Sequence, residues 1–356
     1  MSHMFIPGPV DVAPKVMQAM TKPMIPHRSD EFNELFRHTE ARLKKVFYTE
    51  NRVFQPPATG SGMQEASIRN LVQKDMLSCV NGAFGERWYS VAISNGKQAD
   101  RLEATWGSIH TPDMLAEALK AKHYEAVTIV HNETSTGVEN PLKELAAVVH
   151  EVSPDTLILV DAVSSLGGVK IETDAWGLDF ILTSSQKCFA LPPGMSFAAV
   201  SDRALKKAES VDNRGWYFDL LLFEKHRIKN STAMTPAIAL INGLDAQLDR
   251  ILAEGLDNRF ARHLAMAERI RAWGFEHDMP NLAPLEYCSK TVSTLQNKPG
   301  IDIPALNQFL MTRGMRIANG YGKLKNKTFR IAHMGETQMS DIDTLLEAFD
   351  DFLQKK

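Results

Sequence analysis

One lysine in the sequence, Lys187, has neighbours that favour chemistry. It follows the apolar run Phe180–Thr183 and a short polar turn, and an apolar stretch ending in Pro-Pro-Gly comes after it. Apolar surroundings remove solvation from the ammonium group and therefore lower its pKa. An uncharged lysine amine is the nucleophile that forms an imine with a carbonyl compound. A surface lysine that caps a strand is the alternative explanation for this residue taken alone.

A single acidic residue, Asp161, closes the apolar run Leu157–Val160. A buried carboxylate is costly unless it has a partner. The protonated nitrogen of a pyridine ring would be such a partner, and the carboxylate would keep that ring protonated and able to accept electrons. An aspartate bonded to loop amides explains the same residue equally well.

Two further turns could hold the rest of a planar, phosphorylated ligand. Gly60-Ser61-Gly62 opens a helix-like segment, where backbone amides and a hydroxyl can bind phosphate. Phe84 lies between glycines after an apolar run, so its ring could lie flat against another ring. An ordinary turn and a core phenylalanine are the respective alternatives.

A hydroxyl and a cation complete the candidate groups. Thr134 follows an apolar run and could bond a phenolate oxygen, or it could belong to a helix N-cap. Arg330 lies inside a short apolar run, where a guanidinium is expensive unless it faces an anion. Its planar fork suits a substrate carboxylate, and an ion pair with Asp or Glu is the alternative.

These residues all lie at the ends of predicted strands. Helical patterns such as Pro112–Ala121 and Pro141–Val152 separate several of the apolar runs. This alternation predicts a mostly parallel sheet flanked by helices, and ligands bind beyond the carboxyl ends of such strands. The predicted strands of the sheet are Met76–Val80, Ala126–Val130, Thr156–Val160, Phe180–Thr183 and Phe197–Val200.

The pattern changes after Pro236. Apolar residues recur at helical spacing over 237–252 and 258–273, and two later runs, Thr291–Gln296 and Thr328–Ala332, predict short strands. We therefore expect an N-terminal arm (1–15), a large α/β domain (16–256) and a smaller C-terminal α+β domain (257–356).

Composition excludes several classes of protein. The 356 residues are 44% apolar, which is enough to bury a large core. Their net charge of −3 gives no indication of a nucleic-acid-binding surface. No run approaches the roughly 20 apolar residues of a membrane helix. The N-terminus lacks a signal-peptide pattern. Cys79, Cys188 and Cys288 are too scattered for a disulfide framework or a metal site, so we expect a cytoplasmic protein without metal.

Taken together and in this order, the motifs resemble the class V aminotransferases, a branch of the fold-type I pyridoxal-phosphate enzymes. The chain is similar to their alanine–glyoxylate and serine–glyoxylate (serine–pyruvate) subgroup, and the similarity covers nearly its whole length. The matching segments are Ile6-Pro-Gly-Pro9, His27-Arg-Ser-Asp-Glu-Phe32, Gly60-Ser-Gly62, Asn81–Arg87, Glu133-Thr-Ser-Thr-Gly137, Val160–Gly168, Ser185-Gln-Lys187 and Phe329-Arg-Ile331. The Ser-Gln-Lys and Ser-Leu-Gly-Gly blocks are the most specific.

The resemblance implies a role for each matching residue. Lys187 would form the Schiff base with pyridoxal 5'-phosphate and shuttle the proton, and Asp161 would pair with the pyridine nitrogen. Arg330 and Gly8 would bind the substrate. The implied cofactor-binding set is Gly60, Ser61, Gly62, Met63, Phe84, Thr134, Asp161, Ser185, Gln186, Lys187, Thr232 and Thr235.

The resemblance also implies a ping-pong transfer from a small amino acid to a 2-oxo acid. Alanine, serine or aspartate could be the donor, and glyoxylate, pyruvate or 2-oxoglutarate the acceptor. The family builds its sites at a homodimer interface, where Thr232 or Thr235 would reach the neighbour's phosphate. Two positions depart from the pattern, because relatives often have tryptophan at Phe84 and a polar residue at Met63.

Three other functions stay open. A cysteine desulfurase shares the fold and would use a reactive thiol, for which Cys288 is the candidate. A phosphonate- or phosphoserine-specific transaminase needs extra cations, for which His27, Arg28 and Lys323 are candidates. A non-catalytic binding protein would more readily have lost Lys187 or Asp161, which are both present.

Overall fold

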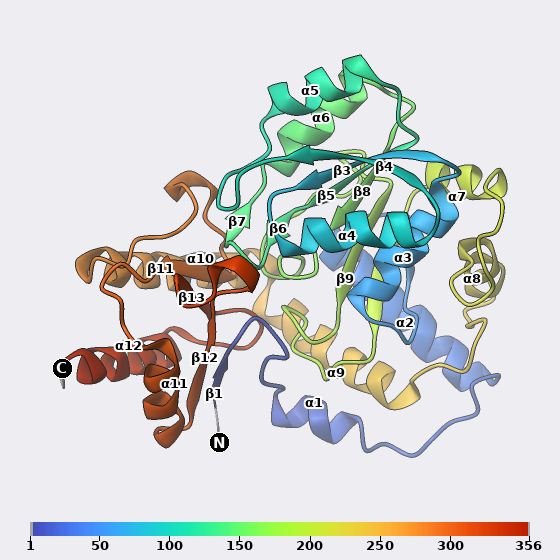
Figure 1. The fold of residues 1–356 in the computed structure, drawn as a ribbon. Helices are drawn as coiled ribbons and strands as arrows, with labels where there is room; N and C mark the ends of the chain where they lie inside the picture. Colours follow the sequence, from blue (N-terminus) through green and yellow to red (C-terminus); the bar gives the residue numbers. More distant parts are fainter. Residues whose placement is uncertain (1–2, 355–356) are drawn as a thin grey trace.

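A computed structural model describes residues 3–354. Its main feature is a seven-stranded sheet in the order β2-β10-β9-β8-β5-β3-β4, with helices on both faces (Figure 1). The five strands from β4 to β9 are parallel, and β10 and β2 continue the sheet in antiparallel pairing. The strands are β2 (Arg52–Phe54), β3 (Asp75–Val80), β4 (Gln98–Glu103), β5 (Ala126–Val130), β8 (Leu157–Asp161), β9 (Phe180–Ser184) and β10 (Ser196–Val200).

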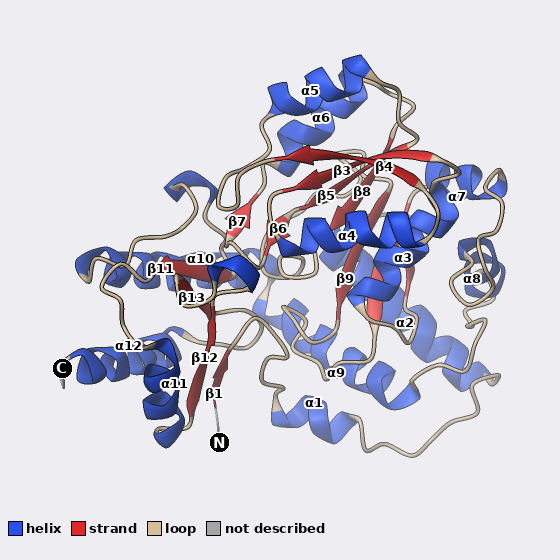
Figure 2. Ribbon diagram, viewed as in Figure 1, coloured by secondary structure: helices blue, strands red, loops and turns tan. Residues whose placement is uncertain are grey.

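A second, four-stranded sheet has the order β1-β12-β13-β11 and lies beside the first (Figure 2). Its strands are β1 (His3–Phe5), β11 (Val292–Gln296), β12 (Met315–Asn319) and β13 (Thr328–Ala332). A short hairpin, β6 (Asn132–Glu133) and β7 (Val138–Glu139), follows β5. The mostly parallel α/β architecture with helices on both faces is confirmed. The division into arm, large and small domain stays a prediction, and β1 of the expected arm pairs within the second sheet.

Twelve α-helices and two 3-10 turns occur within residues 3–354. In the first half of the chain they are α1 (Pro14–Ala19), α2 (Asp30–Phe47), α3 (Gly60–Leu71), α4 (Ala83–Ser94), α5 (Pro112–Ala121) and α6 (Leu142–Val152). The second half contributes α7 (Asp202–Glu209), α8 (Leu220–Arg227), α9 (Ile238–Glu254), α10 (Leu256–Glu276), η1 (Leu285–Tyr287), α11 (Ile303–Thr312), η2 (Gly322–Leu324) and α12 (Met339–Leu353).

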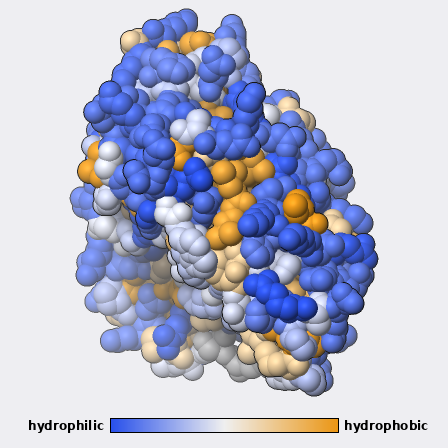
Figure 3. Space-filling view, turned by 90° about the vertical axis from the view of Figure 1, so that its right-hand side faces the viewer, coloured by the Kyte–Doolittle hydropathy of each residue, from blue (hydrophilic) through white to orange (hydrophobic). Residues whose placement is uncertain are grey.

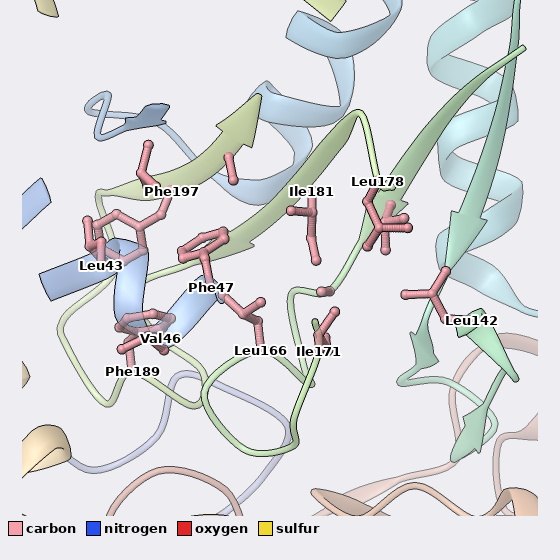
Figure 4. Close-up of a cluster of buried hydrophobic side chains, with 14 of the residues drawn as sticks. Leu43, Val46, Phe47, Leu142, Leu166, Ile171, Leu178, Ile181, Phe189 and Phe197 are labelled. Atoms are coloured by element: carbon pink, nitrogen blue, oxygen red, sulfur yellow. The ribbon is translucent and has the colours of Figure 1, made fainter. Parts of the chain in front are cut away.

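The alternation of side chains along the central strands explains why both sheet faces are covered. In β8, Ile158 and Val160 join one core cluster with α2, α5, α6 and α9. Leu157 and Leu159 join a second cluster with α3, α4, α7 and α8. Successive strand residues point to opposite faces, so a strand buried on both sides is continuously apolar. Figure 4 shows part of the first cluster, which includes Phe47, Phe189 and Ile181.

Two strands of the sheet, β2 and β4, were not among the predicted strands. The edge strand β4 reads Gln-Ala-Asp-Arg-Leu-Glu and is largely solvated, so the sequence pattern did not predict it. It forms because its backbone pairs with β3 over six residues. Helices α9 and α10 are separated only by Gly255, whose φ of 82° ends one helix and starts the next. This break lies next to the expected boundary between residues 256 and 257.

Candidate active site

The carboxyl ends of three neighbouring strands bring the predicted residues together. Asp161 ends β8 and lies opposite Leu182 of the adjacent β9, after which the chain turns to Lys187. Thr134 follows β5 on the other side of β8. Asp161 and Lys187 influence each other's ionisation, so their charged groups share one local environment. The parallel topology therefore assembles a site from segments far apart in the sequence.

Lys187 has the perturbed amine that its sequence context predicts. Burial and, to a smaller extent, the positive charge of Arg330 lower the pKa of Lys187 to about 8, while Asp161 acts in the opposite direction. The amine donates a hydrogen bond to the carbonyl of Pro7. Gly8 has a φ of 91°, and a Cβ there would lie 2.8 Å from Nζ of Lys187. The N-terminal segment therefore covers the lysine, and much of the amine is uncharged near pH 8.

Asp161 is a buried carboxylate without a cation. Its oxygens accept hydrogen bonds from Nε2 of Gln64 at 2.7 Å and from the amide of Val163 at 2.8 Å. Burial raises the pKa of Asp161, and these two hydrogen bonds oppose the rise. No ion pair involves this carboxylate within residues 3–354. It can therefore accept a hydrogen bond from a cationic ring nitrogen and offset part of its desolvation cost.

Helix α3 begins at Gly60 beside these two residues. Thr59 is its N-cap and accepts a hydrogen bond from the amide of Gly62 at 3.2 Å. A Cβ on Gly60 would lie 2.8 Å from Val163, so only glycine fits against the loop that follows Asp161. Ser61 is half-buried at the helix start, where its hydroxyl can face an anion. Met63 differs, because its side chain is fully buried in the second core cluster and its amide bonds within the helix.

Aromatic rings and cations line the opposite side of the site. Phe84 begins α4, lies 5.9 Å from the ring of Tyr321, and has the guanidinium of Arg87 over its own ring at 4.7 Å. Arg87 also donates to the Ser61 hydroxyl at 3.3 Å. The half-buried ring of Phe84 thus has the guanidinium of Arg87 over one face and the tilted ring of Tyr321 beside it. The small sheet contributes Tyr321 from the segment just before η2.

Arg330 is buried without a carboxylate partner. Only 8% of the residue is exposed, and its guanidinium donates to the carbonyls of Asn319 and Thr134, each at 3.2 Å. Burial lowers the pKa of Arg330 to about 10. No ion pair involves Arg330 in the described chain, so the predicted alternative of an Asp or Glu partner is not found. A buried cation in this state is suited to an anionic ligand.

Three of the predicted residues form hydrogen bonds that hold loops of the site in place. Thr134 donates from its hydroxyl to Ser164 at 2.8 Å. Ser185 donates to the carbonyl of Pro192 at 2.8 Å and so fixes the turn that carries Lys187. The backbone carbonyl of Gln186 accepts from the amide of Val10, which attaches the same turn to the N-terminal segment. The first two hydroxyls therefore organise loops in this structure.

Thr232 and Thr235 lie in another part of the molecule, on the segment between α8 and α9. The Thr232 hydroxyl donates to the carbonyl of Met234, and the carbonyl of Thr232 accepts from Arg28 at 2.6 Å. Thr235 is exposed. Within residues 3–354, no hydrogen bond joins either threonine to Lys187 of the same chain. This position is compatible with a ligand bound to a second copy.

Sequence reasoning missed three residues of this site. Glu133 is fully buried and accepts hydrogen bonds from the amides of Phe84 and Gly85, at 3.0 and 3.1 Å, which fixes the start of α4. Gln64 holds Asp161, and Arg87 connects Ser61 with Phe84. Glu133 and Arg87 lie inside segments that already matched the family pattern, which was the available signal. Gln64 offered only its position one helical turn after Gly60.

The residues of the alternative functions do not form sites of their own. Cys288 is buried, its thiol contacts the carbonyls of Ala283 and Pro284, and burial raises its pKa. Arg28 is bound to the segment 231–233, and Lys323 lies over the ring of Trp106. A reactive thiolate needs an exposed, electropositive setting. The structure therefore offers no feature that favours desulfuration or a second phosphate site.

Comparisons with known proteins agree with this arrangement. The model of the family described as Aminotransferase class-V matches residues 21–273. An uncharacterized aminotransferase of Methanocaldococcus jannaschii is 37% identical over 338 residues, covering 93% of this chain and 87% of that protein. L-aspartate–glyoxylate aminotransferase of Paracoccus denitrificans is 34% identical over 342 residues, covering 93% and 86%.

A solved structure gives the same result. Alanine–glyoxylate aminotransferase from Nostoc sp. superposes with a TM-score of 0.93 at 31% identity, over 99% of this chain and 95% of that one. The predicted family and fold are thus both confirmed. The chain belongs to the class V aminotransferases and is an enzyme of that family.

Proposed function

We propose that this aminotransferase uses pyridoxal 5'-phosphate to move an amino group from alanine, serine or aspartate to a 2-oxo acid. The observation that carries the proposal is the pairing of Lys187, whose pKa is lowered to about 8, with Asp161, a buried carboxylate that lacks a cation. A nucleophilic amine and an unpaired carboxylate are the two groups that the reactive and the ring-nitrogen ends of this cofactor require.

The residues around this pair fit the rest of the cofactor. The start of α3, with Gly60, Ser61 and Gly62, offers amides and a hydroxyl to the phosphate. The half-buried ring of Phe84 offers a flat apolar surface to the pyridine ring. When bound, pyridoxal phosphate supplies an aldehyde carbon and a ring that accepts electrons.

The chain's own residues would then handle the protons. Nζ of Lys187 is uncharged often enough near neutral pH to take the proton from Cα of the amino acid. Asp161 keeps its negative charge close to the ring nitrogen and so holds a proton there. Gly8 and the carbonyl of Pro7 keep the amine pointing into the site and shield it from water.

Arg330 would bind the α-carboxylate that donor and acceptor share. Its guanidinium is anchored by two carbonyls but has no anionic partner, so a substrate carboxylate completes its coordination. The same position serves both substrates in turn, as a ping-pong transfer requires. Glyoxylate is the acceptor that we favour, because two of the relatives above carry it in their names.

A panel of amino acids tests this proposal most directly. Purified protein is loaded with pyridoxal phosphate, and its visible absorbance is followed after each amino acid is added. We expect conversion with at least one of alanine, serine and aspartate, and recovery of the first spectrum after glyoxylate. Lys187→Ala should lose both the lysine-dependent absorbance and turnover. Protein that leaves the spectrum of free pyridoxal phosphate unchanged would contradict the proposal.

The homodimer forms part of the same proposal. Figure 3 shows apolar side chains gathered among polar ones on the face that includes α7 and α8. Trp216 and Ile228 on this side are 68% and 63% exposed, which is unusual for large apolar residues. Thr232 and Thr235 lie on the adjoining segment. A second copy covering this face would place one of these threonines near its neighbour's phosphate, and light scattering of the loaded enzyme tests the dimer.

A further inference from the structure

Arg259 is a guanidinium without solvent exposure, located in the first turn of α10. A charged group this deeply buried is retained only when its hydrogen bonds are satisfied. Arg259 donates to two backbone carbonyls, those of Gly167 at 3.0 Å and Cys188 at 2.8 Å. It also donates to the carboxylates of Glu254 at 2.8 Å and Glu336 at 3.4 Å.

The two carbonyls belong to the loops that carry the reactive pair. Cys188 directly follows Lys187, so its carbonyl lies in the turn that carries the lysine, one peptide bond further along the chain. Gly167 lies in the turn that starts at Asp161 at the end of β8. One rigid, planar fork thus bonds both loops at once. A shift of either loop relative to the other would break a charge-assisted hydrogen bond.

The carboxylates connect the same fork with the second sheet. Glu336 lies in the loop after β13, the strand that carries Arg330, and Glu254 ends α9. Burial raises the pKa of Glu336, but Arg259 and Arg250 outweigh this effect, so the pKa stays below its ordinary value and the carboxylate stays charged. Arg259 is therefore in contact with four segments: the two catalytic loops, the end of α9 and the loop that follows the substrate-binding strand.

We propose that Arg259 is a positioning residue that fixes the Lys187 turn relative to the Asp161 turn and couples both to the strand of Arg330. The kinetic consequence of this inference rests on the proposed function. The coupling between the loops does not depend on it. Reaction at Cα requires the lysine amine at a fixed place, and a displacement of about 1 Å costs roughly a hundredfold in rate. Arg259 acts through the turn and touches no substrate.

Arg262, one turn further along α10, provides a matched control. It donates to Glu254 at 2.7 Å and to the carbonyls of Gly335 and Thr337, but no hydrogen bond connects it with residues 185–191. Arg262→Lys therefore disturbs the same buried network without releasing the lysine turn. Arg259→Lys keeps the charge but loses the fork, because an ammonium cannot bond two carbonyls and two carboxylates in the same geometry.

Hydrogen exchange measured by mass spectrometry tests the coupling without cofactor. The segment 185–191 contains the amides of Ala190 and Leu191, which bond to the carbonyls of Lys187 and Ser185 at 2.8 and 3.0 Å. In Arg259→Lys we expect exchange of this segment to be about tenfold faster than in the unmodified protein, and in Arg262→Lys less than about threefold faster. Equal exchange in the two variants would overturn the proposal.

Kinetics of the loaded enzyme give the second readout. Arg259→Lys should lower kcat for the alanine half-reaction by about ten- to a hundredfold with KM changed by less than about threefold, while Arg262→Lys should not. A loss of thermal stability with unchanged kcat would show a structural role only. If Arg259→Lys does not fold, Glu336→Gln is measured instead, and unchanged exchange of segment 185–191 would then overturn the proposal. Failure of the unmodified protein to bind pyridoxal phosphate would refute the proposed function but leave the exchange result valid.

Discussion

Replacing Lys187 with methionine in the cofactor-free protein should increase the stability of the fold. The methionine side chain is close to lysine in length and carries no charge, so it removes the ammonium while filling most of the space. Burial lowers the pKa of Lys187 from 10.5 to about 8 in the folded protein. The folded state therefore disfavours the charged lysine, and the unmodified protein is less stable at neutral pH because of it.

The magnitude and its pH dependence follow from that difference in pKa. A change from 10.5 to about 8 corresponds to about 3 kcal/mol in favour of the unfolded state at pH 7. Between about pH 8 and 10.5 the unfolded chain binds the proton and the folded chain does not, so the stability of the unmodified protein rises with pH. The advantage of Lys187→Met should accordingly fall to about 1 kcal/mol at pH 10 and vanish above pH 11.

Urea denaturation at pH 7 and pH 10 measures both values. Lys120→Met is the matched control, because Lys120 is exposed in the last turn of α5. This control should change the free energy of unfolding by less than about 0.5 kcal/mol at either pH. Loss of the hydrogen bond from Lys187 to the carbonyl of Pro7 opposes the gain, so about 3 kcal/mol is an upper bound. If Lys187→Met has no greater free energy of unfolding than the unmodified protein at pH 7, or if the difference does not shrink at pH 10, the assignment of a desolvated amine is refuted.

Three further replacements test separate parts of the site. Arg330→Gln should raise KM for amino acid and 2-oxo acid alike by about a hundredfold, because it removes the cation at the α-carboxylate, and steady-state kinetics with both substrates measure it. Asp161→Asn should lower kcat by about a hundredfold or more, because a neutral amide does not hold the ring proton. Stopped-flow absorbance of the half-reaction measures this rate, and an unchanged rate would contradict the role of Asp161. Cys288→Ala should leave transamination within about threefold, since its thiol is buried, and loss of sulfide release from cysteine would instead favour desulfurase chemistry.

Much of the site could be predicted because its residues follow apolar strands. The carboxyl ends of parallel strands share one edge of the sheet, so Asp161, Lys187 and Thr134 had to lie together once the strands were identified. The edge strand β4 could not be predicted, because it is held by backbone pairing and its side chains are solvated. A run of apolar residues in the sequence indicates a buried strand. Because β4 is not buried, it has no such run.

The roles of the supporting residues could not be predicted from local sequence patterns, for a different reason. Gln64, Glu133 and Arg259 act through contacts across 97, 49 and 92 positions of the chain, to Asp161, Phe84 and Gly167. No spacing rule relates residues so far apart, and a buried polar side chain resembles a solvated one in sequence. Met63 is a different case, because the resemblance implies a contact with the cofactor, whereas the helix turns the Met63 side chain into the core.

The cations of the site lower the pKa of Lys187. Arg330 and Arg87 both lower the pKa of Lys187, and only Asp161 and the thiol of Cys188 oppose them. Such an excess of positive charge is unfavourable in the absence of ligand, since the cations repel one another in a medium of low dielectric constant. It also keeps the lysine amine uncharged and ready to react. A phosphate at the start of α3 and a carboxylate at Arg330 would each reduce the repulsion, so anions should bind and raise the pKa of the lysine together. The lowered pKa of Lys187 therefore reflects its burial first and these cations second, and a variant that removes Arg330 or Arg87 should make the amine more basic.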